Sequence, residues 1–143
     1  MIFNSTSENE TEQIASQVAK TLSFGDVLLL NGNLGVGKSV FARGLIRGML
    51  NDPTHIIPSP TFSLVQTYDY DGGQIWHFDL YRLTDPDDIL EIGWEEALSS
   101  GIVLVEWPER LGPWVPKNSI IVTIQPTENN PAHRLIDVRN QNE

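Results

Sequence analysis

Apolar residues fall into two patterns along the chain, and each pattern predicts a different kind of element. The runs at 26–30 and 101–106, DVLLL and GIVLVE, are short and nearly continuous, which is typical of strands buried on both faces. The segment 74–82 alternates instead and predicts a strand with two different faces. Helical spacing begins after Ser7 and recurs at 40–47. This mixture of helices and buried strands indicates an α/β protein.

The first predicted helix begins at a capping box in residues 7–10, SENE, and carries Ile14, Val18 and Leu22 on one face. We expect that face to pack on the sheet. A contact between the start of this helix and a bound base has no support from spacing and stays open. The other expected elements are a helical stretch capped by 84–88, a short helix at 109–115, strands at 119–125 and 133–138, and a frayed end at 140–143.

A hairpin is predicted around residues 71–73, DGG, with strands in 61–70 and 74–82. Alternation in the second strand places Trp76, Phe78 and Leu80 on one face and Ile75, His77 and Asp79 on the other. Asp79 then stands near the end of the strand as a carboxylate without a simple packing role. We interpret His77 as a structural polar residue rather than a base.

The strand at 26–30 leads into a glycine-rich segment that matches the phosphate-binding pattern GxxxxGK(S/T), the Walker A motif. Glycines let the backbone turn its N–H groups around a polyphosphate, and the following helix begins beneath the phosphates. Lys38 can then reach the β- and γ-phosphates, and the Ser39 hydroxyl can bind Mg²⁺. The expected nucleotide-binding residues are Gly32, Asn33, Leu34, Gly35, Val36, Gly37, Lys38 and Ser39.

Two further segments carry candidate chemistry. The run at 101–106 ends in Glu106, as a Walker B strand does, and an acid there can bind Mg²⁺ or orient the attacking water. Pro58 and Pro60 hold an extended loop that presents Thr61, whose hydroxyl can bind Mg²⁺ or sense the γ-phosphate. Spacing alone also fits an ordinary loop threonine.

The helix after the Walker A motif has Gly44 and Gly48 on one face, which can permit close approach to the sheet or to another protein, although drift at the helix end explains Gly48 equally well. Its cations Arg43 and Arg47, together with Lys38, are expected to cluster around the phosphate loop.

Composition narrows the choice of partners. The chain has 143 residues, which suggests one domain over 1–143, and its 9 basic and 19 acidic residues give a net charge of −10. Such a surface repels DNA, RNA and anionic membranes unless a local basic patch is present, so docking on another protein is the more natural expectation.

Other classes of site find little support. The chain has no cysteine, and its three histidines lie far apart, which argues against a clustered metal site. No run of 18 apolar residues is present and the N-terminal segment is polar and acidic, so we expect a cytoplasmic protein.

The segments GNLGVGKS, FARGL, SPTFSLV, HFDLYRL and LVEWPER, in this order, resemble the TsaE family, also called YjeE. The resemblance implies a small bacterial P-loop ATPase that works with TsaB and TsaD to make threonylcarbamoyladenosine next to the anticodon of certain tRNAs. The fold we expect is a single α/β P-loop NTPase domain. Its central sheet is mixed and mostly parallel, flanked by helices, with antiparallel hairpin strands added.

The resemblance also implies residue roles. Lys38 and Ser39 bind phosphate and Mg²⁺, Thr61 belongs to a switch-like loop, Asp79 and Glu106 are essential acids, and Trp107 occupies a functional position, although packing is a sufficient reason for a tryptophan. Glu106 is assigned to Mg²⁺, while the share of Asp79 in water activation stays open. Many relatives differ at Asn33 and Val40, but the backbone N–H groups at both positions remain available.

The resulting hypothesis is an ATPase with ATP and Mg²⁺ as cofactors that resets TsaD and TsaB and meets tRNA only through them. It performs no threonylcarbamoyl transfer itself. A small-molecule kinase would need an acceptor site and usually an arginine-rich lid, and a Ras-like GTPase would need an NKxD motif and the glycine of DxxG, which 79–82 lacks. A nucleotide-dependent binding module that never requires hydrolysis stays open.

Overall fold

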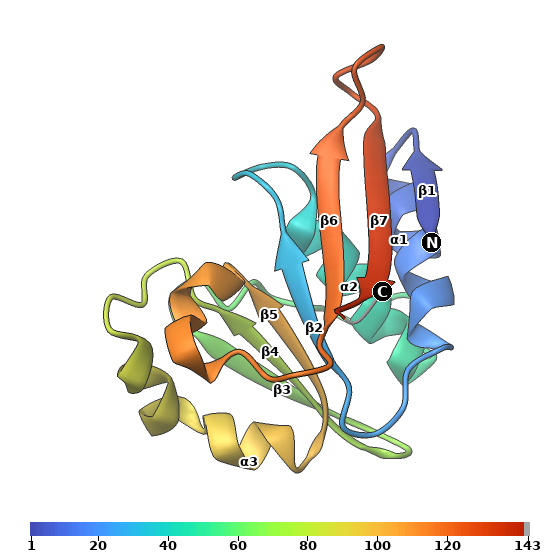
Figure 1. Ribbon diagram of the computed structural model, residues 1–143. Coiled ribbons are helices and arrows are strands. Elements are labelled where there is room, and N and C mark those ends of the chain that lie inside the picture. The colour runs from blue at the N-terminus through green and yellow to red at the C-terminus, as the bar shows by residue number, and fades with distance from the viewer. Residues whose placement is uncertain (142–143) are drawn as a thin grey trace.

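The two apolar runs form neighbouring strands at the centre of the sheet. In the computed structural model, which describes residues 1–141, β2 (Val27–Asn31) pairs in parallel with β5 (Gly101–Glu106). β5 is buried at every residue and β2 at every residue but its last, because helices cover both faces of the sheet (Figure 1). The predicted buried strands are confirmed.

Within residues 1–141 the strands form one sheet of seven, in the order β1-β7-β6-β2-β5-β4-β3. The inner strands β6, β2, β5 and β4 run parallel, and antiparallel pairs extend both edges. This confirms the predicted mixed, mostly parallel sheet with an antiparallel hairpin. The remaining strands are β1 (Ile2–Ser5), β3 (Val65–Tyr70), β4 (Gly73–Asp79), β6 (Ile120–Pro126) and β7 (Arg134–Asn140).

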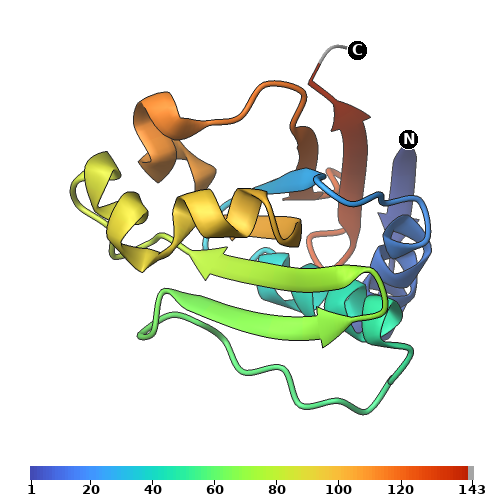
Figure 2. The ribbon, with the colours of Figure 1, turned by 90° about the horizontal axis from the view of Figure 1, so that it is seen from below.

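Helices lie on both faces of the sheet, as Figure 1 and Figure 2 show. On one face, α1 (Glu8–Ala19) and α2 (Lys38–Leu50) close a core that includes Leu28 and Leu104. On the other, three short elements cover Trp76 and Phe78, the face that alternation predicted. These elements are the 3₁₀ helices η1 (Pro86–Ile92) and η2 (Pro108–Trp114) and the α-helix α3 (Trp94–Leu98).

Both ends of the chain differ from expectation. β1 was not predicted, because only Ile2 and Phe3 are apolar there and its pairing partner is the distant β7. Asn140 ends β7 rather than fraying, and 142–143 lie outside the described residues. Among residues 1–141, no helix combines the length and hydropathy that crossing a membrane requires.

The close approach allowed by Gly44 and Gly48 is to α1, rather than to the sheet or another protein. A Cβ on Gly44 would lie 2.6 Å from the Glu12 Cα and carbonyl oxygen. Arg43 and Arg47 also turn toward α1, where both contact the Glu12 carboxylate, at 3.2 and 2.9 Å. The expectation that these arginines gather around the phosphate loop is therefore wrong.

Gly44→Ala is expected to destabilise the protein. Overpacking at the contact with Glu12 should lower the free energy of unfolding by about 1–3 kcal/mol. This loss outweighs the gain of roughly 1 kcal/mol that alanine brings to a helix interior. Urea unfolding, monitored by circular dichroism, measures the net change in the free energy of unfolding. A higher unfolding midpoint in the variant would contradict the tight contact between the two helices.

Candidate functional site

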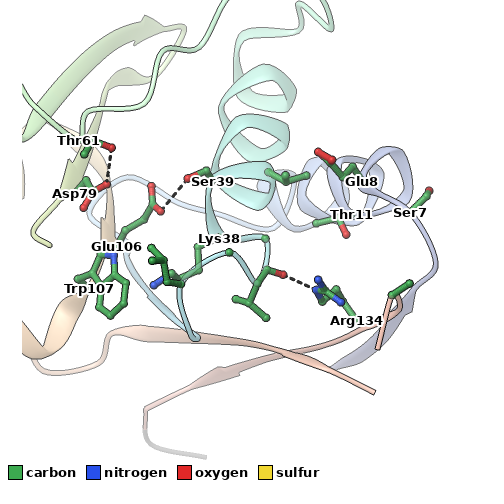
Figure 3. A pocket seen from close by; sticks show the side chains of 16 residues that line it. Ser7, Glu8, Thr11, Lys38, Ser39, Thr61, Asp79, Glu106, Trp107 and Arg134 are labelled. Carbon is green, nitrogen blue, oxygen red and sulfur yellow. Dashed lines mark hydrogen bonds between the residues drawn. The ribbon is translucent and has the colours of Figure 1, made fainter. Parts of the chain in front are cut away.

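The phosphate loop and the two predicted acids come from the carboxyl ends of neighbouring parallel strands. β2 ends in the phosphate loop, β4 ends at Asp79 and β5 ends at Glu106. Register places Asp79 directly opposite Glu106, and Glu106 opposite Leu30. The loop and both acids therefore meet at one edge of the sheet, where α/β proteins commonly bind ligands (Figure 3).

The phosphate loop has the backbone form that its glycines make possible. Gly35 and Gly37 adopt φ values of +79° and +118°, which residues with a Cβ rarely take. Gly37 is also the N-cap of α2, and within the described residues no side chain caps this helix. The first N–H groups of α2 are thus left for a ligand, as at other anion-binding helix N-termini.

Lys38 is a buried cation without a hydrogen-bond partner. The residue is only 5% exposed, and within residues 1–141 its Nζ makes no hydrogen bond. The Nζ lies 3.4 Å from the centroid of the Trp107 ring. Burial lowers the pKa of Lys38 below its ordinary value, although Glu106, Glu109 and Asp79 oppose this effect. An unpaired buried ammonium beside an uncapped helix N-terminus fits a phosphate ligand.

Each acid is paired with a hydroxyl group. The Ser39 hydroxyl donates a hydrogen bond to Glu106 Oε1 at 3.3 Å, and the Thr61 hydroxyl donates one to Asp79 Oδ2 at 3.4 Å (Figure 3). Asp79 Oδ1 also accepts from the Tyr81 N–H at 3.0 Å, which fixes this carboxylate. These hard oxygen donors suit Mg²⁺, which commonly uses one or two carboxylates together with substrate phosphates. Among the described residues, no group of three or more histidines, cysteines and acids is placed to hold a metal ion without such a ligand.

Trp107 follows Glu106 in a left-handed backbone conformation with φ of 60°. A non-glycine residue held there stores roughly 1–3 kcal/mol of strain, which is found mostly at functional sites. The turn brings the indole against the Lys38 ammonium and the Tyr81 ring, whose centroid is 4.9 Å away. Trp107 thus forms a wall of the site.

The candidate residues surround a cavity of about 410 Å³, which is within the range of small-molecule sites. Gly32 and Asn33 belong to the loop but do not line the cavity. The predicted residues that do line it are Leu34, Gly35, Val36, Gly37, Lys38, Ser39, Thr61, Asp79, Glu106 and Trp107.

Sequence reasoning missed the far end of the cavity, which is formed by the start of α1 and by β7. Ser7, Glu8 and Thr11 line it from α1, so the helix start that spacing left open does face the cavity. Arg134 also lines it and donates from Nε to the Val36 carbonyl oxygen at 2.6 Å. No local pattern signals Arg134, because only the order of the strands brings it beside the phosphate loop.

His77 contacts a predicted site residue, Glu106, which its interpretation as a structural polar residue did not include. Its Nε2 lies 2.7 Å from Glu106 Oε2, and both side chains are buried. Alternation along β4 had already placed His77 on the same face as Asp79, but only the pairing of β4 with β5 brings it to Glu106.

A phosphate loop between β2 and α2, with acids at the ends of adjacent parallel strands, defines this protein as a member of the P-loop NTPase class. The chain belongs to the TsaE family. The family model described as "Threonylcarbamoyl adenosine biosynthesis protein TsaE" matches residues 5–136, so the family predicted from the sequence motifs is confirmed.

Similar proteins cover most of the chain. The tRNA threonylcarbamoyladenosine biosynthesis protein TsaE of Rickettsia conorii is 43% identical over 87% of this chain and 70% of its own length. The protein of the same name from Rickettsia bellii is 42% identical over 94% of this chain and 92% of its own. Among solved structures, Bacillus subtilis YdiB superposes with a TM-score of 0.76 and 28% identity, covering 96% of this chain and 83% of its own.

Proposed function

We propose that this protein is a Mg²⁺-dependent ATPase in the biosynthesis of threonylcarbamoyladenosine in tRNA. The observation that carries the proposal is the convergence of an unpaired Lys38 with two hydroxyl–carboxylate pairs, Ser39 with Glu106 and Thr61 with Asp79. One pair suffices to hold a cation beside bound phosphates. The second pair is available to the γ-phosphate and to a water molecule.

The phosphate loop and Lys38 bind the polyphosphate in this mechanism. Backbone N–H groups at the start of α2 donate to the phosphates, and Lys38 exchanges its contact with Trp107 for charge-assisted hydrogen bonds. Ser39 and Glu106 would hold Mg²⁺, which when bound neutralises charge on the phosphates. Asp79 accepts a hydrogen bond from the attacking water, and Thr61 lies beside it as the residue that responds to the γ-phosphate.

The segment after Thr61 carries an exposed aromatic side chain that suits contact with a partner protein. Phe62 is 85% exposed, which is unusual for a large aromatic residue and suits a surface that docks on another protein. We propose that hydrolysis shifts the 61 loop and resets a complex of TsaD and TsaB in the cytoplasm. The acidic surface, with a net charge of −10, favours contact with tRNA only through that complex.

Phosphate release from Mg-ATP, with and without TsaD and TsaB, tests this proposal. We expect slow turnover by the protein alone and faster turnover with both partners, because a partner docked on Phe62 would hold the loop that presents Thr61 in place. Rapid turnover that ignores the partners, or no turnover under any condition, would contradict the ATPase proposal. A phosphorylated acceptor accumulating together with ADP would identify a kinase instead.

A further inference from the structure

The Glu106 carboxylate is held from two sides by residues of two different elements. Ser39 of α2 donates to Oε1 at 3.3 Å, and His77 of β4 lies 2.7 Å from Oε2. His77 and Glu106 are each only 2% exposed, so water does not compete for this contact. Ser39 and His77 therefore both orient the Glu106 carboxylate.

The chemistry of the pair fixes which ring nitrogen of His77 donates. A carboxylate that binds Mg²⁺ is ionised and only accepts hydrogen bonds, so in that role Glu106 requires His77 Nε2 to carry a proton and to donate a hydrogen bond to Oε2. The other ring nitrogen, Nδ1, is buried and has no hydrogen-bond partner within residues 1–141. Among the described residues, the contact with Glu106 is thus the one hydrogen bond that the His77 ring makes.

We propose that His77 is a positioning residue that orients the Glu106 carboxylate for Mg²⁺. By holding Oε2, it leaves Oε1 directed at Ser39, the other residue assigned to the cation. Groups that hydrogen-bond a metal-binding carboxylate typically change metal affinity or activity by about 10–100-fold when removed. This inference rests on the proposed function, because it takes Glu106 as the carboxylate on the Mg²⁺ side.

A structural role for His77 makes a different prediction from a positioning role. Any buried carboxylate needs a donor, so loss of His77 lowers stability in either case. If His77 only satisfies that need, nucleotide binding should depend on Mg²⁺ as strongly in a folded variant as in the wild type. If it positions Glu106, the Mg²⁺-dependent part of binding and the turnover rate should fall together.

The variants H77Q and H77M separate these roles. Glutamine places an amide N–H close to where His77 Nε2 stands, whereas methionine has a similar length and no donor. Affinity for N-methylanthraniloyl-ADP is measured with and without Mg²⁺, together with thermal unfolding and the kcat and KM of phosphate release. For H77M we expect the Mg²⁺-dependent gain in affinity, and kcat, to fall by about 10–100-fold. Metal-free binding should stay near wild type, and H77Q should recover most of the loss.

Each other outcome overturns a stated part of the inference. A folded H77M whose binding keeps the full Mg²⁺ dependence would leave His77 a structural role only. Should H77M fail to fold, H77N replaces it, because the shorter amide cannot reach Oε2, and equal results for H77N and H77Q would overturn the positioning role. A wild-type protein that releases no phosphate from ATP, or releases it equally fast without Mg²⁺, would instead overturn the proposed function itself.

Discussion

Glu106→Gln is expected to abolish most phosphate release while the protein still binds nucleotide. Glu106 would hold the Mg²⁺ whose charge stabilisation is worth several kcal/mol, so its loss should lower turnover by about 10²–10⁴-fold. Glutamine keeps the shape and the buried packing of Glu106, and the backbone groups of the phosphate loop are untouched. Phosphate release and affinity for a fluorescent ADP analogue, measured on the same preparation, separate the two effects.

Glu109→Gln is the matched control for this variant. Glu109 is exposed, and its charge acts on Lys38 only electrostatically. Among the described residues it makes no hydrogen bond to Ser39 or His77, so its loss should change turnover little. Full turnover in Glu106→Gln would contradict the assignment of this acid. If the variant binds nucleotide and supports tRNA modification fully without hydrolysis, the protein acts as a nucleotide-dependent binding module instead.

The phosphate loop was predictable because all of its determinants are local. The loop directly follows β2 and leads directly into α2. Gly35 and Gly37 adopt the positive φ values that the glycines of the motif make possible. The two acids were predictable for a related reason. Asp79 and Glu106 each end a strand, and the carboxyl ends of parallel strands meet at one sheet edge.

The contacts that escaped prediction depend on which elements become neighbours. Arg134 reaches Val36 only because β7 and β6 lie beside β2, and His77 reaches Glu106 only because β4 pairs with β5. Arg43 was misplaced for a similar reason, because the spacing along α2 could not show that α1 covers that face of the helix. Sequence patterns thus predicted the groups that carry the chemistry better than the groups that hold them.

Lys38→Met is expected to lower ATP affinity by about 100-fold or more, since a hydrogen bond to a charged group contributes roughly 1.5–3 kcal/mol and Lys38 reaches two phosphates. Methionine preserves the packing of the aliphatic stem and removes the ammonium that lies on the Trp107 ring. Calorimetric titration with ATP measures the loss. Lys117→Met makes the same chemical change at an exposed position and should leave affinity unchanged.

The same Lys38→Met substitution is expected to stabilise the nucleotide-free protein, by roughly 1 kcal/mol, because an unsatisfied buried donor is itself destabilising. The pKa of Lys38 is lowered in the folded chain, so in the alkaline range below its ordinary pKa the unfolded chain binds more protons. The contribution of Lys38 to wild-type stability should therefore rise with pH in that range, and the variant should lack this contribution. Chemical unfolding at several pH values measures both effects. A variant less stable than the wild type would contradict this expectation. It would show that the attraction between Lys38 and the acids around it stabilises the folded protein by more than the burial of its charge destabilises it.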